Sequence, residues 1–379
     1  MKKIFVLFLA ILFVSVSACK NPFFKNMLDK DSGNEGSGDW NSQSSDVGSF
    51  EDAGDFVKII PPANGIVGVA PDYALPGNEA WWQGVFIAGR TVKLSPYKIG
   101  KMEVTYELWY SVLKWNTDNG KGYVFANKGL EGWDGTGGGG TYPNYANIGK
   151  PPTANKNHPV TMVSWRDCIV WCNAYTEKEK GIGECVYRKK DNHTVVLKDA
   201  TATADCDAAY ADMSKKGFRL PTDAEWEYAA RWQNDNTNAT DYGEGGSNVW
   251  LTKLNSASGA KDKWDTAETG EVVWYSVNSG YKTHTVGKKR ANALGLYDMS
   301  GNVWEWCFDW WNNNPASNDA AYEQGGIVTD PQGAASGSDR VLRGGSWFDL
   351  AYFCSVGVRG YYGPDYWRNF VGFRLACRP

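Results

Sequence analysis

The sequence has 379 residues, with 39 Lys and Arg against 43 Asp and Glu, which gives a formal net charge of -4. This near balance offers no basic stripe for nucleic acid and no polybasic patch for anionic lipid, so neither is expected to bind the protein surface directly. The 19 Trp and 43 Gly predict an irregular, loop-rich architecture in place of a regular sheet or bundle.

The first 18 residues are typical of a signal peptide. Two lysines precede an apolar run, residues 4–14, that is shorter than the roughly 20 residues needed to cross a bilayer. The following VSAC resembles a bacterial lipobox and predicts lipidation of Cys19, the alternative being an ordinary cleaved signal with a stray cysteine. We therefore expect an exported protein held to a membrane through the lipid on Cys19. Lys20 replaces the Asp that favours inner-membrane retention, which points to the outer membrane or cell surface.

The next stretch, residues 19–55, is predicted to be a flexible tether. It is rich in Gly, Ser, Asn, Asp and Glu and has too few apolar side chains to offset the entropy of ordering. Residues 56–379 exceed the usual size of a single core, but no second low-complexity stretch divides them. We expect them to form one large domain.

Three helices are predicted from capping signals. Residues 105–115 begin with a Thr suited to N-capping, and residues 164–178 begin with Ser164 three residues before an Asp. The phrase RLPTDAEWEYAAR predicts the third, with Thr222 as N-cap and Glu225 at the capping-box position. Short strand-like pieces are residues 85–88, 340–342 and 371–375.

Cysteine count and compartment predict a disulfide. Seven cysteines remain after Cys19, in a compartment where disulfides can form. Cys185 and Cys206 are the preferred pair because they flank a polar, turn-rich excursion, and closing it would stabilise the fold by roughly 3 kcal/mol. The other cysteines are not assigned, and neither their spacing nor the three histidines suggests zinc.

Five phrases in a fixed order carry a family resemblance: HPVTMVSW, GFRLPTDAEWEYAAR, NALGLYDMSGNVWEW, RVLRGGSW and VGFRLA. Together they resemble the sulfatase-modifying-factor family, whose founding member is the formylglycine-generating enzyme, from Glu103 to the C-terminus. The resemblance implies an α+β fold, irregular and loop-rich, of the C-type-lectin-like kind.

Calcium is expected in the phrase DMSGNVWEW, because family members bind calcium in this region. The ligands would be the side chains of Asp298 and Glu305 and the carbonyls of Gly301 and Val303, since carboxylate and carbonyl oxygens suit a hard cation. The alternative is a hydrogen-bonded turn whose carboxylates cap backbone amides.

The resemblance also raises the possibility of catalysis. The founding enzyme oxidises a substrate cysteine through two cysteines after the GGS turn, which bind copper as a soft thiolate pair. Here the first position is Asp349 and the second is Cys354, so one thiolate is replaced by a hard carboxylate, which argues against formylglycine synthesis. Cys354 and Ser346 would be the catalytic residues, and copper the cofactor, if the oxidase interpretation held.

The C-terminal segment, residues 343–379, is instead predicted to be a binding face for a protein or glycan ligand. Between its family motifs it is crowded with aromatic, Gly, Ser, Asp and Asn residues, the composition of an antibody paratope. A core role for these aromatics is the alternative, but their clusters lack a period of 2 or 3.6. The predicted contact residues are Phe348, Asp349, Tyr352, Phe353, Ser355, Tyr361, Tyr362, Asp365, Tyr366 and Trp367.

Such a tail also resembles the variable proteins of diversity-generating retroelements, which display diversified C-terminal residues at a surface. The residues Ala351, Cys354, Val356, Arg359 and Pro364 fit a constant frame between variable sites. Trp367 departs from the pattern, because adenine mutation of an asparagine codon does not produce tryptophan.

Overall fold

The computed structural model describes residues 46–132, 145–312 and 326–379. The predicted signal peptide, Cys19 and most of the predicted tether lie outside these residues. Within the described part of the chain, no helix has the length and apolar character needed to span a bilayer.

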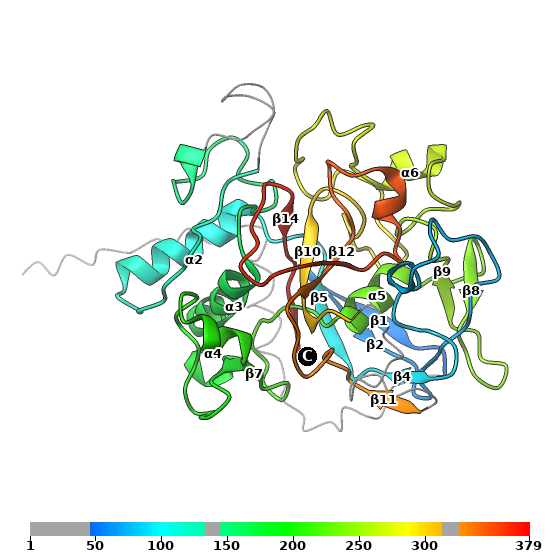
Figure 1. Cartoon of the computed structure of the whole chain (residues 1–379), viewed down its shortest axis with the longest axis horizontal. Coiled ribbons are helices and arrows are strands. Elements are labelled where there is room, and N and C mark those ends of the chain that lie inside the picture. Colours follow the sequence, from blue (N-terminus) through cyan, green and yellow to red (C-terminus); the bar gives the residue numbers. More distant parts are fainter. Residues whose placement is uncertain (1–45, 133–144, 313–325) are drawn as a thin grey trace, which may run out of the picture.

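In the described residues, fifteen short strands form two four-stranded sheets, one three-stranded sheet and two hairpins, arranged as in Figure 1. The sheet orders are β1-β2-β5-β15, β13-β12-β10-β14 and β11-β4-β3, and the hairpins are β6-β7 and β8-β9. The strands are β1 (Ser49–Ala53), β2 (Phe56–Ile60), β3 (Ile66–Val67), β4 (Thr91–Lys93), β5 (Tyr97–Gly100), β6 (Tyr187–Arg188), β7 (Tyr210–Ala211), β8 (Ala239–Asp241), β9 (Trp250–Thr252), β10 (Trp304–Trp310), β11 (Ile327–Thr329), β12 (Arg340–Arg343), β13 (Gly360–Tyr362), β14 (Val371–Gly372) and β15 (Ala376–Cys377).

The helices begin where the capping signals predict. Thr105 accepts a hydrogen bond from the backbone of Leu108, and Ser164 and Thr222 each complete a capping box with the residue three positions on. The α-helices are α2 (Tyr106–Asp118), α3 (Trp165–Lys180), α4 (Thr203–Asp207), α5 (Asp223–Arg231) and α6 (Ala267–Val272). Single 3₁₀ turns are Ala80–Trp82, Tyr145–Asn147, Ile182–Glu184 and Ala351–Cys354.

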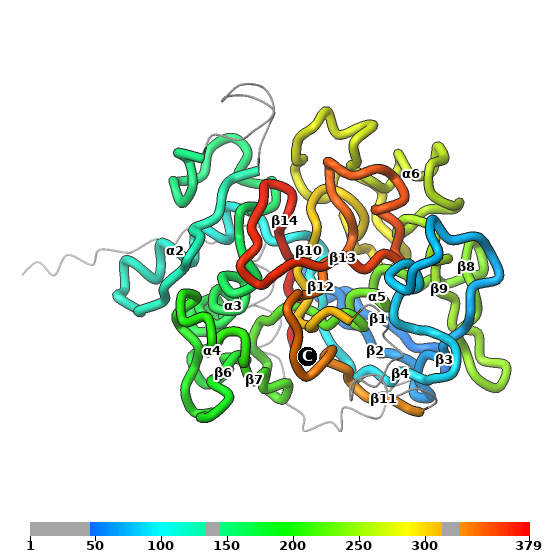
Figure 2. The backbone as a smooth tube through the Cα atoms, viewed as in Figure 1, coloured from blue at the N-terminus to red at the C-terminus, as the bar shows by residue number. Residues whose placement is uncertain are grey.

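The core consists mainly of two clusters of buried side chains. One lies around α2 and α3 and includes Trp109 and Trp171, whose rings stack at 5.4 Å. The other surrounds α5 and includes Trp226. Figures 1 and 2 show the C-terminal strands at the centre of the molecule, between the α2–α3 side and the side that carries β8 and β9. The end of the chain is thus part of the scaffold as well as of its surface.

The boundary predicted between tether and domain is too late in the chain. Strand β1 lies within residues 19–55 and pairs antiparallel with β2 along its whole length. Phe50 packs edge-on against Trp232 at 5.0 Å. The five-residue strand is stabilised by its pairing with β2 and by this aromatic contact. The composition of the segment does not reveal either of them.

The strand predicted at residues 85–88 is not formed, whereas those at 340–342 and at 371–372 are. The backbone of Val85 is hydrogen bonded by side chains instead of by a neighbouring strand. Its N–H donates to the Glu227 carboxylate at 2.8 Å, and its carbonyl accepts from Arg90 at 2.5 Å. The charged side chains of Glu227 and Arg90 therefore satisfy the backbone N–H and carbonyl of Val85.

The predicted disulfide between Cys185 and Cys206 is also absent. Both residues are buried free thiols. The sulfur of Cys185 lies 3.3 Å from the carbonyl of Asn173, and that of Cys206 lies 3.3 Å from the carbonyl of Asp199. The excursion between them is held by packing and by Asn173, whose side chain donates to the carbonyls of Tyr187 and Leu197. A covalent link is not needed to order this loop.

Candidate ligand-binding face

The C-terminal segment leaves the sheet at β12 through two glycines in the left-handed region. Gly344 has φ +94° and Gly345 has φ +71°. A Cβ on Gly345 would lie 2.7 Å from the sulfur of Cys354 and 2.8 Å from the carbonyl of Phe353. Glycine is therefore required where the chain turns back against its own 3₁₀ turn. Ser346, in the GGSW phrase, and Asp349, two residues after it, follow this turn at the start of the C-terminal segment.

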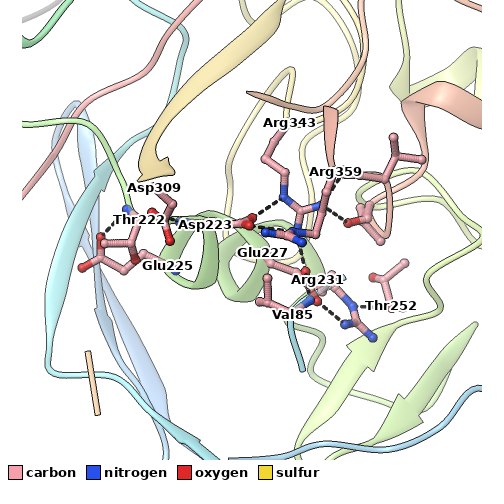
Figure 3. A network of polar contacts seen from close by, with 12 residues as sticks. Val85, Thr222, Asp223, Glu225, Glu227, Arg231, Thr252, Asp309, Arg343 and Arg359 are labelled. Atoms are coloured by element: carbon pink, nitrogen blue, oxygen red, sulfur yellow. Dashed lines mark hydrogen bonds and ion pairs between the residues drawn. The ribbon is translucent and has the colours of Figure 1, made fainter. Parts of the chain in front are cut away.

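A buried network of charges fixes both ends of this loop to α5 (Figure 3). Arg343 at the end of β12 and Arg359 just before β13 bind the two oxygens of Asp223, each at 2.7 Å. Arg343 also pairs with Glu227 and donates to the carbonyls of Val356 and Val358. All four charged side chains are essentially inaccessible to solvent. The residues between the two arginines thus form a rigid support, which suits a preorganised binding surface.

Asp349 lies where this support reaches the surface. Its Oδ2 accepts a hydrogen bond from the indole N–H of Trp304 at 2.9 Å and another from the Ser346 hydroxyl. Its backbone carbonyl accepts from the N–H of Ser276 at 2.9 Å, which ties a second loop to the segment. Burial raises the pKa of the Asp349 carboxyl, and hydrogen bonds from the Ser346 hydroxyl, the Trp304 indole and the Ser346 backbone oppose this effect.

Cys354 lies beneath the face as a buried thiol. Its side chain is inaccessible, and burial raises the pKa of the thiol well above its usual range, with the charge of Asp349 acting in the same direction. A neutral thiol in such surroundings packs as a small apolar side chain and is a poor metal ligand or nucleophile. Ser346 is equally inaccessible, so both residues of the predicted oxidase site are turned into the protein.

Several predicted contact residues form a continuous aromatic surface. We call Phe348, Tyr362, Tyr366 and Phe370 the aromatic face. Tyr362 stacks on Tyr366 at 3.7 Å, Tyr366 lies 6.5 Å from Phe370, and Phe370 stacks on Phe348 at 6.2 Å. Phe348 is 53% exposed and Tyr362 42%, which is high for such large rings. The fold brings these four rings together, with Phe348 and Tyr362 exposed and Tyr366 and Phe370 half-buried.

Beside this face, Tyr361 is 45% exposed and packs on Trp311 at 3.9 Å. Asp365 is exposed and Trp367 is half-buried. Three contributors were not predicted from the sequence: Trp311, Phe370 and Leu350, the last of which is 51% exposed. Trp311 lies outside the predicted binding segment, whereas Phe370 lies within it, directly before the VGFRLA phrase, but was not among the predicted contacts.

Other predicted contact residues are not at the surface. Ser355 is 1% exposed and its hydroxyl donates to the carbonyl of Tyr352, so its predicted ligand contact is wrong. Tyr352 and Phe353 are half-buried and pack against Trp82, with ring centroids at 6.0 and 5.8 Å. They occupy the 3₁₀ turn and pack inward, so they support the loop and leave only part of each ring at the surface.

The comparisons with known proteins agree with this architecture. The chain matches the Sulfatase-modifying factor enzyme 1-like domain over residues 64–379. It belongs to the sulfatase-modifying-factor family. The match begins well before Glu103, where the sequence motifs start.

Two known proteins are similar over most of this chain. A formylglycine-generating enzyme of Thermomonospora curvata is 30% identical over 305 residues, which are 76% of this chain and 84% of that protein. The chaperone protein LppX of Paenibacillus barcinonensis is 28% identical over 287 residues, 73% of this chain and 80% of that one.

Solved structures of similar fold include Treponema denticola variable protein 1. It has a TM-score of 0.56 and 32% identity, covering 88% of this chain and 99% of the other. The structure of CarF, with a TM-score of 0.51 and 24% identity, shares the fold. The predicted α+β, loop-rich, C-type-lectin-like fold of the formylglycine-generating-enzyme type is therefore confirmed.

Of the two carboxylates predicted to hold calcium, one is engaged by an arginine and the other keeps one oxygen without a hydrogen-bond partner. Both oxygens of Glu305 are bound by Arg374, at 2.5 and 2.6 Å, and one also accepts from the indole of Trp226. A cation would compete with this guanidinium for the same carboxylate. Asp298 accepts from the N–H of Gly287, and its other oxygen has no hydrogen-bond partner in the structure. In the described ranges, no three His, Cys, Asp or Glu side chains are grouped to hold a metal.

Proposed function

We propose that this protein is an exported, lipid-anchored binder that presents its C-terminal segment to a protein or glycan ligand at the outer surface of the cell. Its similarity to a protein named as variable, over 88% of this chain, supports a display role. The similarity to the chaperone protein LppX is consistent with a family member whose task is not oxidation of a sulfatase. The lipid on Cys19 and the stretch after it would act as the base of the display device.

One observation carries this proposal: exposed aromatic rings lie on, and directly after, a loop whose two ends a buried ion network ties to α5. Tyrosines and tryptophans give a large contact area at low cost in side-chain entropy. A rigid loop adds little further ordering cost when a ligand binds. Retroelement diversification of this segment is part of the proposal. A reverse-transcriptase gene and a near-copy of the C-terminal coding segment in the genomic neighbourhood would support it.

The binding role is tested with a ligand selected on the full chain from a random peptide library and a glycan array. Replacing Tyr361, Tyr362, Tyr366 and Trp367 together by alanine is expected to weaken that ligand at least about a hundredfold, because aromatic side chains dominate interface energies. Affinity is measured by surface plasmon resonance. Tyr145→Ala, which removes a 47% exposed ring elsewhere, serves as the control and should leave affinity unchanged. Unchanged affinity in the fourfold variant would rule out the proposed face.

Oxidation of a substrate cysteine is the second candidate, favoured by the 30% identity to a formylglycine-generating enzyme. The replacement of one thiolate by Asp349 and the burial of Cys354 oppose it. We expect no conversion when the purified chain is incubated with Cu(I), oxygen and a peptide containing CxPxR, followed by mass spectrometry. A mass decrease that matches conversion of the cysteine CH2–SH group into the aldehyde of formylglycine would establish the oxidase and contradict the non-catalytic proposal.

A further inference from the structure

The carboxylate of Asp349 is held in one orientation with one oxygen left over. The indole N–H of Trp304 and the hydroxyl of Ser346 both donate to Oδ2, and the backbone N–H of Ser346 is a further neutral donor to the carboxylate. Among the described residues, no side chain donates to Oδ1, and Oδ1 is not among the fully inaccessible polar atoms without a partner. The side chain is partly exposed. One oxygen is thus bound to the scaffold, and the other remains for a group that approaches from outside.

No cation of the described residues neutralises this carboxylate. The nearby buried acids Asp223, Glu227 and Glu305 are each ion-paired with an arginine. Asp349 takes part in no such pair, and the groups that shift its pKa are burial and neutral hydrogen-bond donors. Arg368, which is exposed, lies 4.6 Å above the ring of Tyr366. A charge that has lost part of its hydration without a counter-charge is unfavourable, and binding a cation would relieve this cost.

The surroundings of Asp349 suit a cation as well. Phe348 precedes it in the chain. Burial and Tyr362 raise the pKa of the Tyr366 phenol, and Asp349 is close enough for its charge to add to this effect. Both rings belong to the aromatic face, and the faces of aromatic rings attract ammonium and guanidinium groups. Arg368 already rests on Tyr366 in this way. The face therefore offers rings and a carboxylate to the same positive group.

Resting on the proposed binding role, we propose that Asp349 is the acidic centre of a subsite that takes a basic side chain of a protein ligand. The occupant is the ammonium of a lysine or the guanidinium of an arginine. A neutral hydroxyl of a glycan could also donate to Oδ1, but it would leave the negative charge uncompensated. The position where the founding enzyme has a copper-binding cysteine is here a recognition group for positive charge.

The subsite is tested on the full chain by titration with N-acetyl-arginine amide and N-acetyl-lysine amide. N-acetyl-norleucine amide and methyl glucoside are the uncharged probes. The readout is the isotope-labelled indole resonance of Trp304, assigned by comparison with Trp304→Phe, because this N–H is bonded directly to Asp349. We expect the two cationic probes to shift this resonance with millimolar affinity, and the uncharged probes to leave it in place.

Asp349→Asn is nearly isosteric and can still accept from Trp304 and Ser346. It should weaken the arginine probe about tenfold or more. The matched control is Asp191→Asn, which removes an exposed carboxylate outside the C-terminal segment and should leave the affinity within about twofold. The dispersion of the other indole resonances reports whether each variant is folded.

The inference is overturned if norleucine or glucoside shifts Trp304 as strongly as arginine does, if no probe shifts it, or if Asp349→Asn binds arginine like the wild type. In each of these cases the proposed binding face would still stand, provided that the fourfold aromatic variant loses its selected ligand. If that variant also keeps its ligand, the proposed function fails together with this subsite.

Discussion

Replacing Glu227 by glutamine is expected to lower the free energy of unfolding by about 3 kcal/mol or more, because breaking a buried ion pair leaves an uncompensated charge. Glu227 is wholly buried and pairs with Arg231 at 2.6 Å and with Arg343. It also accepts the N–H of Val85 at 2.8 Å. The substitution removes the charge while keeping the volume, so the effect isolates the electrostatic part of the network in Figure 3.

The matched control is Glu268→Gln, which breaks an Arg–Glu pair that is partly exposed to solvent. Such pairs contribute about 0–1 kcal/mol, so little change is expected. Urea unfolding followed by tryptophan fluorescence measures both variants, and the midpoint is compared at unchanged slope. A loss of less than about 1 kcal/mol in Glu227→Gln would show that the network does not hold the C-terminal segment.

Compared with the wild type, the Asp298→Asn variant is expected to be more stable at neutral pH than at acidic pH. Burial raises the pKa of Asp298 from 3.8 to about 6, with Glu305 adding to the effect and the Gly287 N–H, Arg374 and Lys289 opposing it. Because the folded pKa lies above the unfolded one, ionisation of this group costs stability above about pH 6, and the cost disappears as the pH falls. Asparagine cannot ionise, and it tolerates the positive φ of 54° at this position.

The stability advantage of Asp298→Asn should therefore shrink by about 1.4 kcal/mol per pH unit between about pH 6 and pH 4. Any fixed cost of the new amide cancels in this difference. Denaturant unfolding of the variant and the wild type at several pH values measures it. The expectation would be contradicted if the variant were less stable than the wild type at neutral pH. If calcium also stabilised the wild type, the calcium prediction would be supported.

The fold and part of the face were accessible from the sequence because their signals are local or densely repeated. Ser164 and Thr222 specify helix starts by hydrogen bonds to residues three positions away, and the helices begin there. The exposed Tyr361 and Tyr362 occupy an edge strand, and their polar neighbourhood without a core period indicated this. Ser355 was assigned incorrectly, because a small polar residue among aromatics has the same local pattern whether its hydroxyl faces solvent or a carbonyl.

By itself, the sequence determined the family, the helix starts, the replacement of a catalytic cysteine by Asp349, and an aromatic-rich C-terminus. Only the tertiary structure decided which of those aromatics lie at the surface, since Phe370 and Trp311 join the face through contacts with rings distant in the chain. The tertiary structure also decided which charged side chains have a partner of opposite charge. Whether Glu305 can hold a cation depends on Arg374, and whether Asp349 lacks a partner depends on every element packed around it. Such pairings span up to hundreds of residues, so no local pattern encodes them.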